Sequence, residues 1–349
     1  MSPPASVTVE ELTSATEAEW DAFVAEQPRR SHYQRAGWAR VIRNAFGQKP
    51  AYRLARVDGR IEGVLPLVAF ANPLFGRYLV SVPYLNRGGI LAATDRARDA
   101  LRAEAQQLVE STRSAFCELR HVEGIDPALP ARENKVSMSL SLEPGTEVLW
   151  KEIGAKVRNL VRKAEKNDLT VREGDPAKDL GRFYDVFAEN MRDLGTPVYA
   201  RRFFEEVFRE FPDSLRLSVV ESGSDLAAAG ICIRDGGFTE IHWAASSREY
   251  LKFSPNMALY WEAISQAAEA GLTEFCFGRS TEGSGPYRFK KQWGAVPTPL
   301  RWEYLLPPGG ETPGLNPDNP KFRLATRVWQ RLPLPLTRVL GPPIVRHLP

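Results

Sequence analysis

The sequence predicts an α/β protein made of two similar halves. The first half places two amphipathic helices before a β-hairpin, at 17–27, 35–46 and 52–70. The second half repeats this order at 183–189, 200–211 and 215–234. Identity between the halves is low, so the evidence is one of order and spacing. We interpret it as an internal duplication of one α/β unit.

The elements of the first half follow from hydrophobic periodicity and turn residues. Trp20, Phe23 and Val24 share one face of the first helix, and the second helix has the same kind of spacing. In the hairpin, Asp58 and Gly59 supply the positive φ angles that a tight turn needs. The half continues with a strand, a helix and two further strands, at 78–82, 95–114, 116–120 and 136–142.

After the second hairpin the sequence predicts strands and helices in alternation. They lie at 238–245, 255–270, 274–277 and 300–306, with a short helix after Gly285. Ten of the 27 prolines fall between Pro307 and Pro349, so we expect the compact fold to end near Leu306. The predicted domains are residues 1–145 and 146–306, followed by a proline-rich linker and tail at 307–349.

The composition excludes several classes of protein. With 349 residues, 43% hydrophobic and 26% charged, the chain has enough apolar material for a core and too much for disorder. The net charge of +3 comes from the tail, because six Lys or Arg and no Asp or Glu lie from 321 to 349. This distribution argues against a protein that coats nucleic acid over its whole surface.

Cysteine use and hydropathy predict a cytoplasmic protein. Cys117, Cys232 and Cys276 are far apart and set in apolar runs, which is typical of buried thiols in a reducing compartment. The sequence has no CxxC or HExxH spacing, and we predict no metal site. It also has no apolar run long enough to span a bilayer and no signal-peptide pattern.

A basic segment at 151–166 is the first candidate binding site. Lys151, Arg158, Arg162 and Lys166 form a basic face opposite an apolar stripe, at helical spacing. Arginines on one face offer paired donors to phosphate oxygens, so Arg158 and Arg162 are candidate contacts to a pyrophosphate or a nucleic-acid backbone. A solvated basic surface is the alternative.

The second candidate is a glycine- and serine-rich loop that joins a strand to a basic aromatic helix. It reads Gly278-Arg279-Ser280-Thr281-Glu282-Gly283-Ser284-Gly285 and leads into Pro286-Tyr287-Arg288-Phe289-Lys290-Lys291-Gln292-Trp293-Gly294. Loop amides and a helix N-terminus attract anions in α/β folds, although the spacing of a Walker loop is absent. The aromatic residues of the helix are alternatively core anchors.

A third group lies around His242. No Ser or Cys stands at a recognisable spacing from His242, so a nucleophilic triad is not predicted. Asn256 and Tyr260 lie i, i+4 on one helix face and, with Trp243, are candidates to line a substrate cleft. A helix cap and a packed aromatic are the alternative explanation.

The run from Arg279 to Gly294, together with the basic helix upstream, resembles the FemAB-like branch of the GNAT-related acyltransferases. It is most similar to the FemAB-related proteins encoded with exosortase/PEP-CTERM and exopolysaccharide systems. The resemblance covers about 33–306, and its most specific part is Tyr-x-Phe-Lys-x-x-Trp-Gly at 287–294. It implies tandem GNAT-like domains with mixed sheets flanked by helices, in agreement with the duplication.

The resemblance also implies a reaction, the transfer of an aminoacyl group from aminoacyl-tRNA to an amine of a cytoplasmic peptidoglycan precursor. The family's lysine falls on Lys290, which would stabilise the oxyanion or hold the tRNA acceptor end. Direct aminolysis needs no covalent nucleophile, which fits the missing triad. Tyr287 and Arg288 join Lys290 as candidate catalytic residues, and the candidate substrate-binding residues are Arg158, Arg162, Lys291, Arg279, Ser280, Trp243, Asn256 and Tyr260.

Two departures from the family leave the acyl donor open. The Arg/Gln-x-x-Gly-x-Gly/Ala loop that holds coenzyme A in ordinary GNAT enzymes is missing, because 248–257 reads REYLKFSPNM. The tRNA-gripping coiled-coil arm of some Fem proteins has no counterpart either. We expect no bound cofactor, an aminoacyl-tRNA or acyl-CoA donor, and an acceptor that is a peptidoglycan precursor, an exopolysaccharide or a protein. The alternatives are a CoA-dependent N-acetyltransferase and a non-catalytic subunit of an envelope assembly complex.

The tail interleaves apolar residues with basic ones and carries Trp329 near its centre. Such a segment suits an anionic inner-leaflet surface. We therefore expect one of two arrangements: peripheral contact with the inner membrane through residues 321–349, or a tail that packs back on the catalytic domain.

Overall fold

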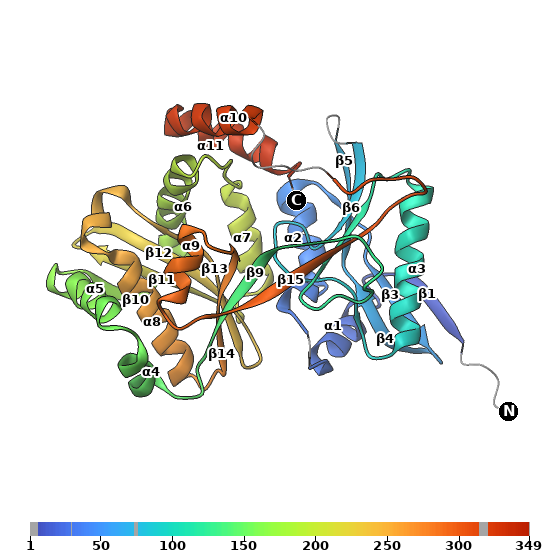
Figure 1. Cartoon of the computed structure of the whole chain (residues 1–349), viewed down its shortest axis with the longest axis horizontal. Helices are drawn as coiled ribbons and strands as arrows, with labels where there is room; N and C mark the ends of the chain where they lie inside the picture. Colours follow the sequence, from blue (N-terminus) through green and yellow to red (C-terminus); the bar gives the residue numbers. More distant parts are fainter. Residues whose placement is uncertain (1–5, 29, 73–75, 314–319, 349) are drawn as a thin grey trace. The chain divides into compact units, whose positions relative to one another are not determined.

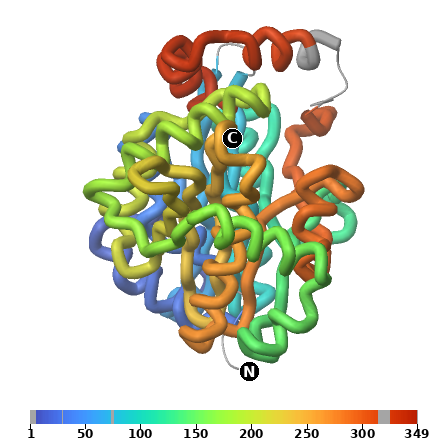
Figure 2. Tube along the Cα trace, turned by 90° about the vertical axis from the view of Figure 1, so that its left-hand side faces the viewer, coloured from blue at the N-terminus to red at the C-terminus, as the bar shows by residue number. Residues whose placement is uncertain are grey.

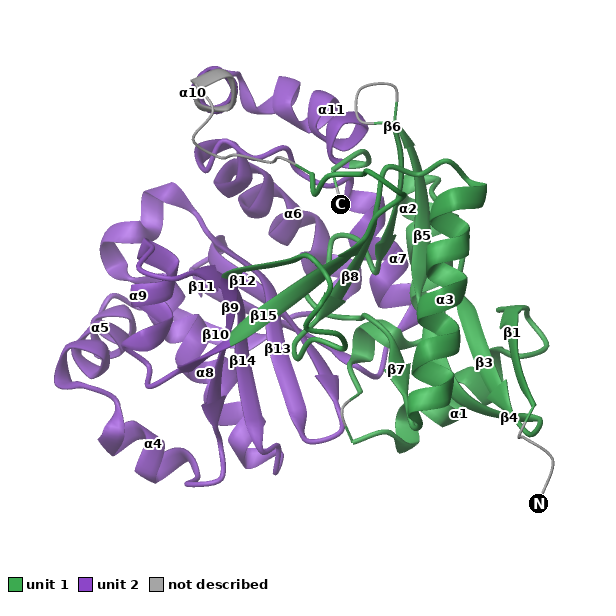
Figure 3. Cartoon of the chain, turned by 45° about the vertical axis from the view of Figure 1, so that its right-hand side comes forward, with its two compact units in different colours: residues 1–134, 299–315, 346–349 green, residues 135–298, 316–345 purple. Residues whose placement is uncertain are grey.

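The computed structural model describes residues 6–28, 30–72, 76–313 and 320–348, which form two compact units (Figure 1, Figure 3). Unit 1 consists of residues 1–134, 299–315 and 346–349. Unit 2 consists of residues 135–298 and 316–345. The predicted domains 1–145 and 146–306 are continuous stretches, whereas each unit also takes residues from the end of the chain.

Unit 1 contains two groups of paired strands. One sheet has the order β1-β3-β4-β7, made of β1 (Val7–Glu11), β3 (Arg53–Val57), β4 (Arg60–Leu65) and β7 (Leu91–Ala92). The second group pairs in the order β15-β8-β6-β5-β2, made of β15 (Val296–Leu305), β8 (Cys117–His121), β6 (Gly76–Ser81), β5 (Leu67–Asn72) and β2 (Lys49–Pro50). The strand predicted to run through 61–70 is therefore two strands, because Pro66 has no N–H to continue the ladder.

The helices of unit 1 are α1 (Glu17–Glu26), η1 (His32–Gln34), α2 (Gly37–Phe46) and α3 (Asp95–Ser111). The predicted helices at 17–27, 35–46 and 95–114 are thus confirmed. Helix α3 lies between β6 and β8 in sequence, and these two strands pair in parallel. The buried face of α3 presents Ala97, Leu101, Ala105 and Val109 to the core of the unit.

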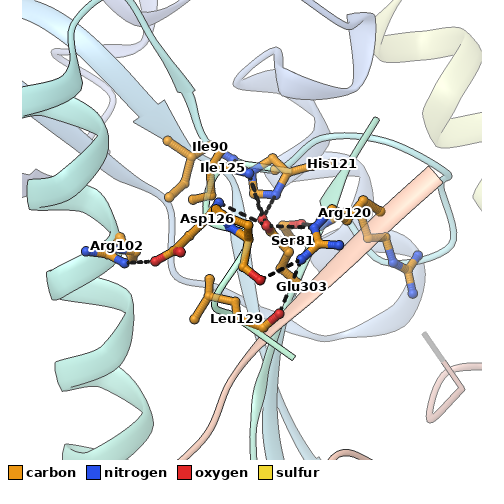
Figure 4. Close-up of polar contacts among 12 residues, drawn as sticks. Ser81, Ile90, Arg102, Arg120, His121, Ile125, Asp126, Leu129 and Glu303 are labelled. Atoms are coloured by element: carbon orange, nitrogen blue, oxygen red, sulfur yellow. Dashed lines mark hydrogen bonds and ion pairs between the residues drawn. The ribbon is translucent and has the colours of Figure 1, made fainter. Parts of the chain in front are cut away.

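A buried polar network connects β15 to β8 and the segment that follows it in unit 1 (Figure 4). The carboxylate of Glu303 lies 2.9 Å from His121 Nδ1 and accepts the N–H groups of Ile125 and Asp126 at 3.1 Å. Burial by itself raises the pKa of Glu303, but these hydrogen bonds outweigh it and lower the pKa. Glu118 likewise accepts from Arg120 at 2.8 Å and from Tyr304 at 2.6 Å. The charges are paired and hydrogen-bonded, so we assign the network a structural role.

Unit 2 pairs its strands in the order β10-β11-β12-β13-β14-β9. These strands are β10 (Thr170–Glu173), β11 (Leu215–Ser222), β12 (Asp225–Asp235), β13 (Phe238–Ser246), β14 (Glu274–Thr281) and β9 (Ala131–Ser141). All neighbours are antiparallel except β13 and β14, which are parallel. The chain connects those two through η2 (Arg248–Phe253) and α8 (Pro255–Glu269).

The two units repeat one plan, as the sequence predicts. Each has a parallel strand pair connected through one long helix, β6-α3-β8 in unit 1 and β13-α8-β14 in unit 2. Each also places two helices before an antiparallel hairpin. In unit 2 these helices are α6 (Pro176–Asp193) and α7 (Arg201–Glu210), before the β11–β12 hairpin.

The basic segment at 151–166 is not one helix, which corrects the prediction. It is divided between α4 (Thr146–Glu152) and α5 (Ala155–Lys166), because Ile153 and Gly154 are extended with ψ of 135° and 149°. Lys151 therefore belongs to a different helix from Arg158 and Arg162. A short helix, α9 (Gly285–Lys291), follows β14 as predicted.

The tail forms two helices, α10 (Pro320–Arg331) and α11 (Leu334–Val345), drawn in red in Figure 2. Both contact α6. Thr337, Gly341 and Val345 are the buried residues of α11, and Arg338 pairs with Asp185 of α6 at 2.8 Å. The tail thus packs on unit 2, which is one of the two arrangements expected from the sequence. None of the described helices is both long and apolar enough to cross a membrane.

Enlarging Gly341 should release α11 from unit 2. A Cβ at this position would lie 2.9 Å from both N and O of Val198, and backbone atoms cannot move aside cheaply. We expect Gly341→Val to make the 316–345 segment cleavable by trypsin in an otherwise folded protein, with Pro343→Val on the exposed side of α11 as the control. Equal protection of both variants would contradict the docked position of α11.

Candidate active site

The candidate site begins where β13 and β14 stop pairing. Their parallel ladder covers Phe238–Glu240 and Glu274–Cys276. Beyond it, β13 continues along β12 to Ser246, and β14 continues along β9 to Thr281. The two strands thus have different partners past Glu240 and Cys276, and we call this place the fork (Figure 1). Ends of parallel strands are where α/β folds position ligands.

Both strands carry an irregularity at the fork. The pairing of β12 and β13 passes from Ile231–Trp243 to Cys232–Ile241, so His242 is an extra residue in β13. The pairing of β14 and β9 shifts between Cys276 and Arg279, where Gly278 has a φ of +73°. Bulges of this kind turn side chains out of the sheet register and are frequent beside active sites.

A buried acid and a histidine lie together at the fork. Glu240 is 1% exposed, and its Oε1 lies 3.2 Å from Nδ1 of His242. Opposite them, Sγ of Cys276 lies 3.3 Å from both Oγ of Ser137 and N of Gly278. Sequence reasoning missed Glu240, although an acid between apolar residues in a predicted strand is the signal that could have found it.

Lys290 reaches the fork from α9. Ser284 caps the N-terminus of the helix, and its Oγ accepts the N–H of Tyr287 at 3.3 Å. One turn later Lys290 is 7% exposed, and its Nζ donates to the carbonyls of Gly278 at 3.1 Å and Arg279 at 2.9 Å. The pKa of Lys290 is lowered to about 8, mainly by burial; the positive charge of Arg279 acts in the same direction, and Cys276 and Glu240 oppose it.

Residues 153–291 match the family model described as an acetyltransferase (GNAT) domain. The match lies within unit 2, and we call this range the GNAT domain. The matched range ends with the last residue of α9 and contains both strands of the fork and Lys290.

Solved structures extend the likeness to the whole chain. The structure of FemX is similar over 91% of this chain and 100% of that one, with a TM-score of 0.68 and 16% identity. L-PGS from Bacillus licheniformis covers 93% and 99%, with a TM-score of 0.57 and 15% identity. A tandem GNAT protein from the clavulanic acid pathway covers 86% and 97%, with a TM-score of 0.53 and 13% identity. These likenesses confirm the predicted tandem GNAT-like fold. No curated protein matches the chain.

The predicted residues of the GNAT domain that lie closest to Lys290 are on β14 and α9. Arg279 is exposed, while Ser280 is buried with no hydrogen-bond partner for its Oγ among the described residues. Tyr287 is buried, Arg288 donates to the carbonyl of Gly283 at 2.5 Å, and Nζ of Lys291 lies 5.9 Å from the Tyr287 ring. Arg288 and Lys291 thus have local partners in α9 and its preceding loop.

A second cation next to Arg279 was missed by sequence reasoning. Lys135 lies on β9 opposite Thr281, and its Nζ contacts Oγ1 of that residue. Burial lowers the pKa of Lys135, and the positive charge of Arg279 adds to the effect. Two neighbouring like charges favour a bound anion, since an anion relieves their repulsion.

Tyr260 packs against aromatic residues of α9 and of the segment that follows it. Its ring stacks on Phe277 at 5.7 Å and meets Phe289 at 5.0 Å and Trp293 at 6.4 Å. Burial raises the pKa of Tyr260, so its hydroxyl stays protonated at neutral pH. Tyr260 lies one turn after the half-buried Asn256 on α8, and these contacts give it a packing role beneath the Phe-Lys-Lys-Gln-Trp-Gly motif.

The other predicted residues have partners elsewhere in the GNAT domain. Nη1 of Arg158 donates to the carbonyls of Trp150 at 3.2 Å and Lys151 at 2.9 Å, which caps the end of α4. The guanidinium of Arg162 lies 5.5 Å from the Trp150 ring. Trp243 packs edge-on against Phe203 and Phe204 of α7, each at 5.4 Å. Substrate contact by these three residues remains a prediction.

Proposed function

We propose that the chain is an N-acyl or aminoacyl transferase that modifies an amine of a cell-envelope or exopolysaccharide precursor. The observation that carries the proposal is the buried Lys290, which lies at the fork of a GNAT domain beside Glu240 and is hydrogen-bonded to the carbonyls of the β14 bulge. Buried ionisable groups with a shifted pKa at a strand end are typical of catalytic sites.

The reaction is aminolysis without an acyl-enzyme. The acceptor nitrogen attacks the carbonyl carbon of the donor, a C–N bond forms, and the carbonyl oxygen becomes an oxyanion. The ammonium of Lys290 has three N–H donors, and two are used by Gly278 and Arg279, so the third can stabilise the oxyanion. Collapse then breaks the bond to the leaving oxygen or sulfur.

His242 and Glu240 supply the proton transfer in this proposal. The acceptor nitrogen loses a proton as the C–N bond forms, and the leaving atom gains one as its bond breaks. An imidazole held by a buried carboxylate can accept the first proton and return it in the second step. Both steps then balance without any further reactant.

Glu240→Gln tests this pair. The amide keeps the size of the side chain but removes the charge that stabilises a protonated His242, so we expect kcat to fall about 100-fold. The matched control is Glu269→Gln at the exposed end of α8, which should leave kcat unchanged. An unchanged kcat in a folded Glu240→Gln variant would exclude the pair from the reaction.

The donor is an aminoacyl-tRNA in the first form of the proposal and an acyl-CoA in the second. Both carry phosphates that suit the cations Lys135 and Arg279. The missing glycine loop before α8 favours aminoacyl-tRNA, while the GNAT match favours a CoA thioester. Thermal shift with coenzyme A and with a non-hydrolysable aminoacyl-tRNA analogue separates them, because only the true donor stabilises the folded state.

The acceptor belongs to the cell envelope in this proposal. One similar solved structure is the C-terminal domain of a putative lysylphosphatidylglycerol synthetase from Agrobacterium fabrum, a name that describes lysine joined to phosphatidylglycerol. The sequence resemblance to proteins encoded with exosortase/PEP-CTERM systems makes an exopolysaccharide-linked acceptor part of the proposal. Such donors and precursors are found in the cytoplasm, where we place the reaction.

The deciding experiment is a mass-spectrometric search for the product. The protein is incubated with an envelope-precursor extract and isotope-labelled aminoacyl-tRNA or acyl-CoA. We expect one precursor mass to increase by the labelled acyl group, and Lys290→Met to form this product far more slowly. Absence of labelled product from both donors, with the protein folded, would favour a non-catalytic subunit of an envelope assembly.

A further inference from the structure

The two tail helices each have an inner and an outer face. On α10, Gln330 donates to the carbonyl of Asp193 at 2.9 Å. Thr326 packs closely on Gly195: a Cβ added to Gly195 would lie only 2.3 Å from the Thr326 methyl group. On α11, the inner positions are Thr337, Gly341 and Val345, spaced by four residues. These contacts fix which side of each helix meets unit 2.

The outer face is apolar. Its exposed side chains are Leu324, Val328, Leu336, Val339, Leu340 and Ile344, and Val339 is the most open at 70%. An ordinary surface helix turns charged residues to solvent. The charged residue of α11, Arg338, is instead paired with Asp185 on the inner side. Helix α11 thus leaves apolar side chains exposed on the face that unit 2 does not cover.

Positive charge borders the outer face. Arg327 and Arg331 are exposed one turn apart on α10. Six of the 46 Lys and Arg residues and none of the 43 Asp and Glu lie from 321 to 349, so the remaining chain has 40 basic and 43 acidic residues and a net charge of −3. An anionic surface is therefore attracted by the tail and repelled by the rest of the chain.

We propose that the outer face of α10 and α11 is a docking surface for an anionic phospholipid bilayer. Its apolar side chains enter the interface between headgroups and acyl chains, and Arg327 and Arg331 bind lipid phosphates. With 12 residues each, the helices lie on the membrane and do not cross it, since a span needs about 20. A symmetric dimer through the same face is disfavoured, because it would bring two uncompensated basic segments together.

The test is vesicle sedimentation with the full chain. We expect binding to vesicles that contain phosphatidylglycerol, weaker binding to pure phosphatidylcholine, and loss of binding at high salt. Val339→Glu with Ile344→Glu should abolish binding. Arg327→Gln and Arg331→Gln should each weaken binding to the anionic vesicles about fivefold. Leu251→Glu, at another exposed apolar residue of unit 2, is the matched control and should bind normally.

Three results would overturn the proposal. The first is no binding of the wild-type chain to phosphatidylglycerol vesicles. The second is undiminished binding by the Val339→Glu, Ile344→Glu variant. The third is a wild-type dimer in analytical ultracentrifugation that this variant converts to a monomer, which would make the face a contact between copies. The melting temperature of each variant shows whether it is folded. The rate of transfer to a soluble acceptor should be the same in all variants.

Discussion

Lys290→Met should lower kcat by about 10²–10³-fold, the effect of removing one oxyanion donor from a preorganised site. Methionine keeps an unbranched chain of similar length in the buried position, so the fold should persist. The matched control is Lys291→Met, one residue along α9, where the side chain is exposed and its ammonium lies over the Tyr287 ring. We expect the control to keep most of its activity in the same transfer assay.

The dependence of kcat on pH in the wild-type protein should reflect the titration of Lys290. Its pKa is lowered to about 8, so the ammonium is present below that pH and is lost as the pH rises through it. If the ammonium is the donor, kcat falls above about pH 8. Lys290→Arg should remove this fall in kcat at high pH, because a guanidinium stays charged. A rate that rises through pH 8 and then stays level would instead identify the neutral amine as the active form.

Trp293→Ala should destabilise the protein by about 3–5 kcal/mol, the range for removing a large buried aromatic side chain. Trp293 is fully buried, belongs to the core of unit 2, and its ring contacts Phe289 and Tyr260. Chemical denaturation measures the loss. Phe289→Ala, at a half-buried position in the same motif, should lower the free energy of unfolding by less.

Trp293→Phe separates packing from chemistry at the same position. The indole Nε1 of Trp293 is buried without a hydrogen-bond partner among the described residues. Phenylalanine removes this unsatisfied donor and keeps most of the ring, so we expect a loss of less than about 1.5 kcal/mol and normal kcat. A folded Trp293→Phe variant with reduced kcat would show that the indole N–H binds substrate.

The parts of the fold that were predictable have strong local signals. The hairpin turn at Asp58-Gly59 and the repeated order of helices and strands depend on nearby residues, and both are present in the structure. The break between α4 and α5 was not predictable, because Ile153 continues the apolar stripe that favours a single helix. The prolines of the tail predict that the compact fold ends near Leu306, yet Pro342 and Pro343 lie within α11, which packs on unit 2.

In the site, too, the residues that a local motif marks could be predicted, and the contacts that depend on strand pairing could not. Lys290 was found from its motif, but the carbonyls that hold it come from the bulge of β14, which sequence periodicity does not reveal. Glu240 and Lys135 were missed because their importance depends on strand pairing. The charge and spacing of Arg158 predict a phosphate contact, whereas its hydrogen bonds to α4 depend on the break between α4 and α5 at Ile153 and Gly154.

Strand β15 has a consequence for biosynthesis. It returns Glu303 and Tyr304 to the core of unit 1, where Tyr304 meets Glu118 across 186 residues of sequence. A ribosome therefore releases residues 135–298 before unit 1 can close. At translation rates of about 5–20 residues per second, the interval from 135 to 305 is about 10–30 s. The nascent first half waits through that interval with Glu118 and Arg120 lacking their final surroundings, so unit 1 is the part most exposed to chaperones and proteases during synthesis.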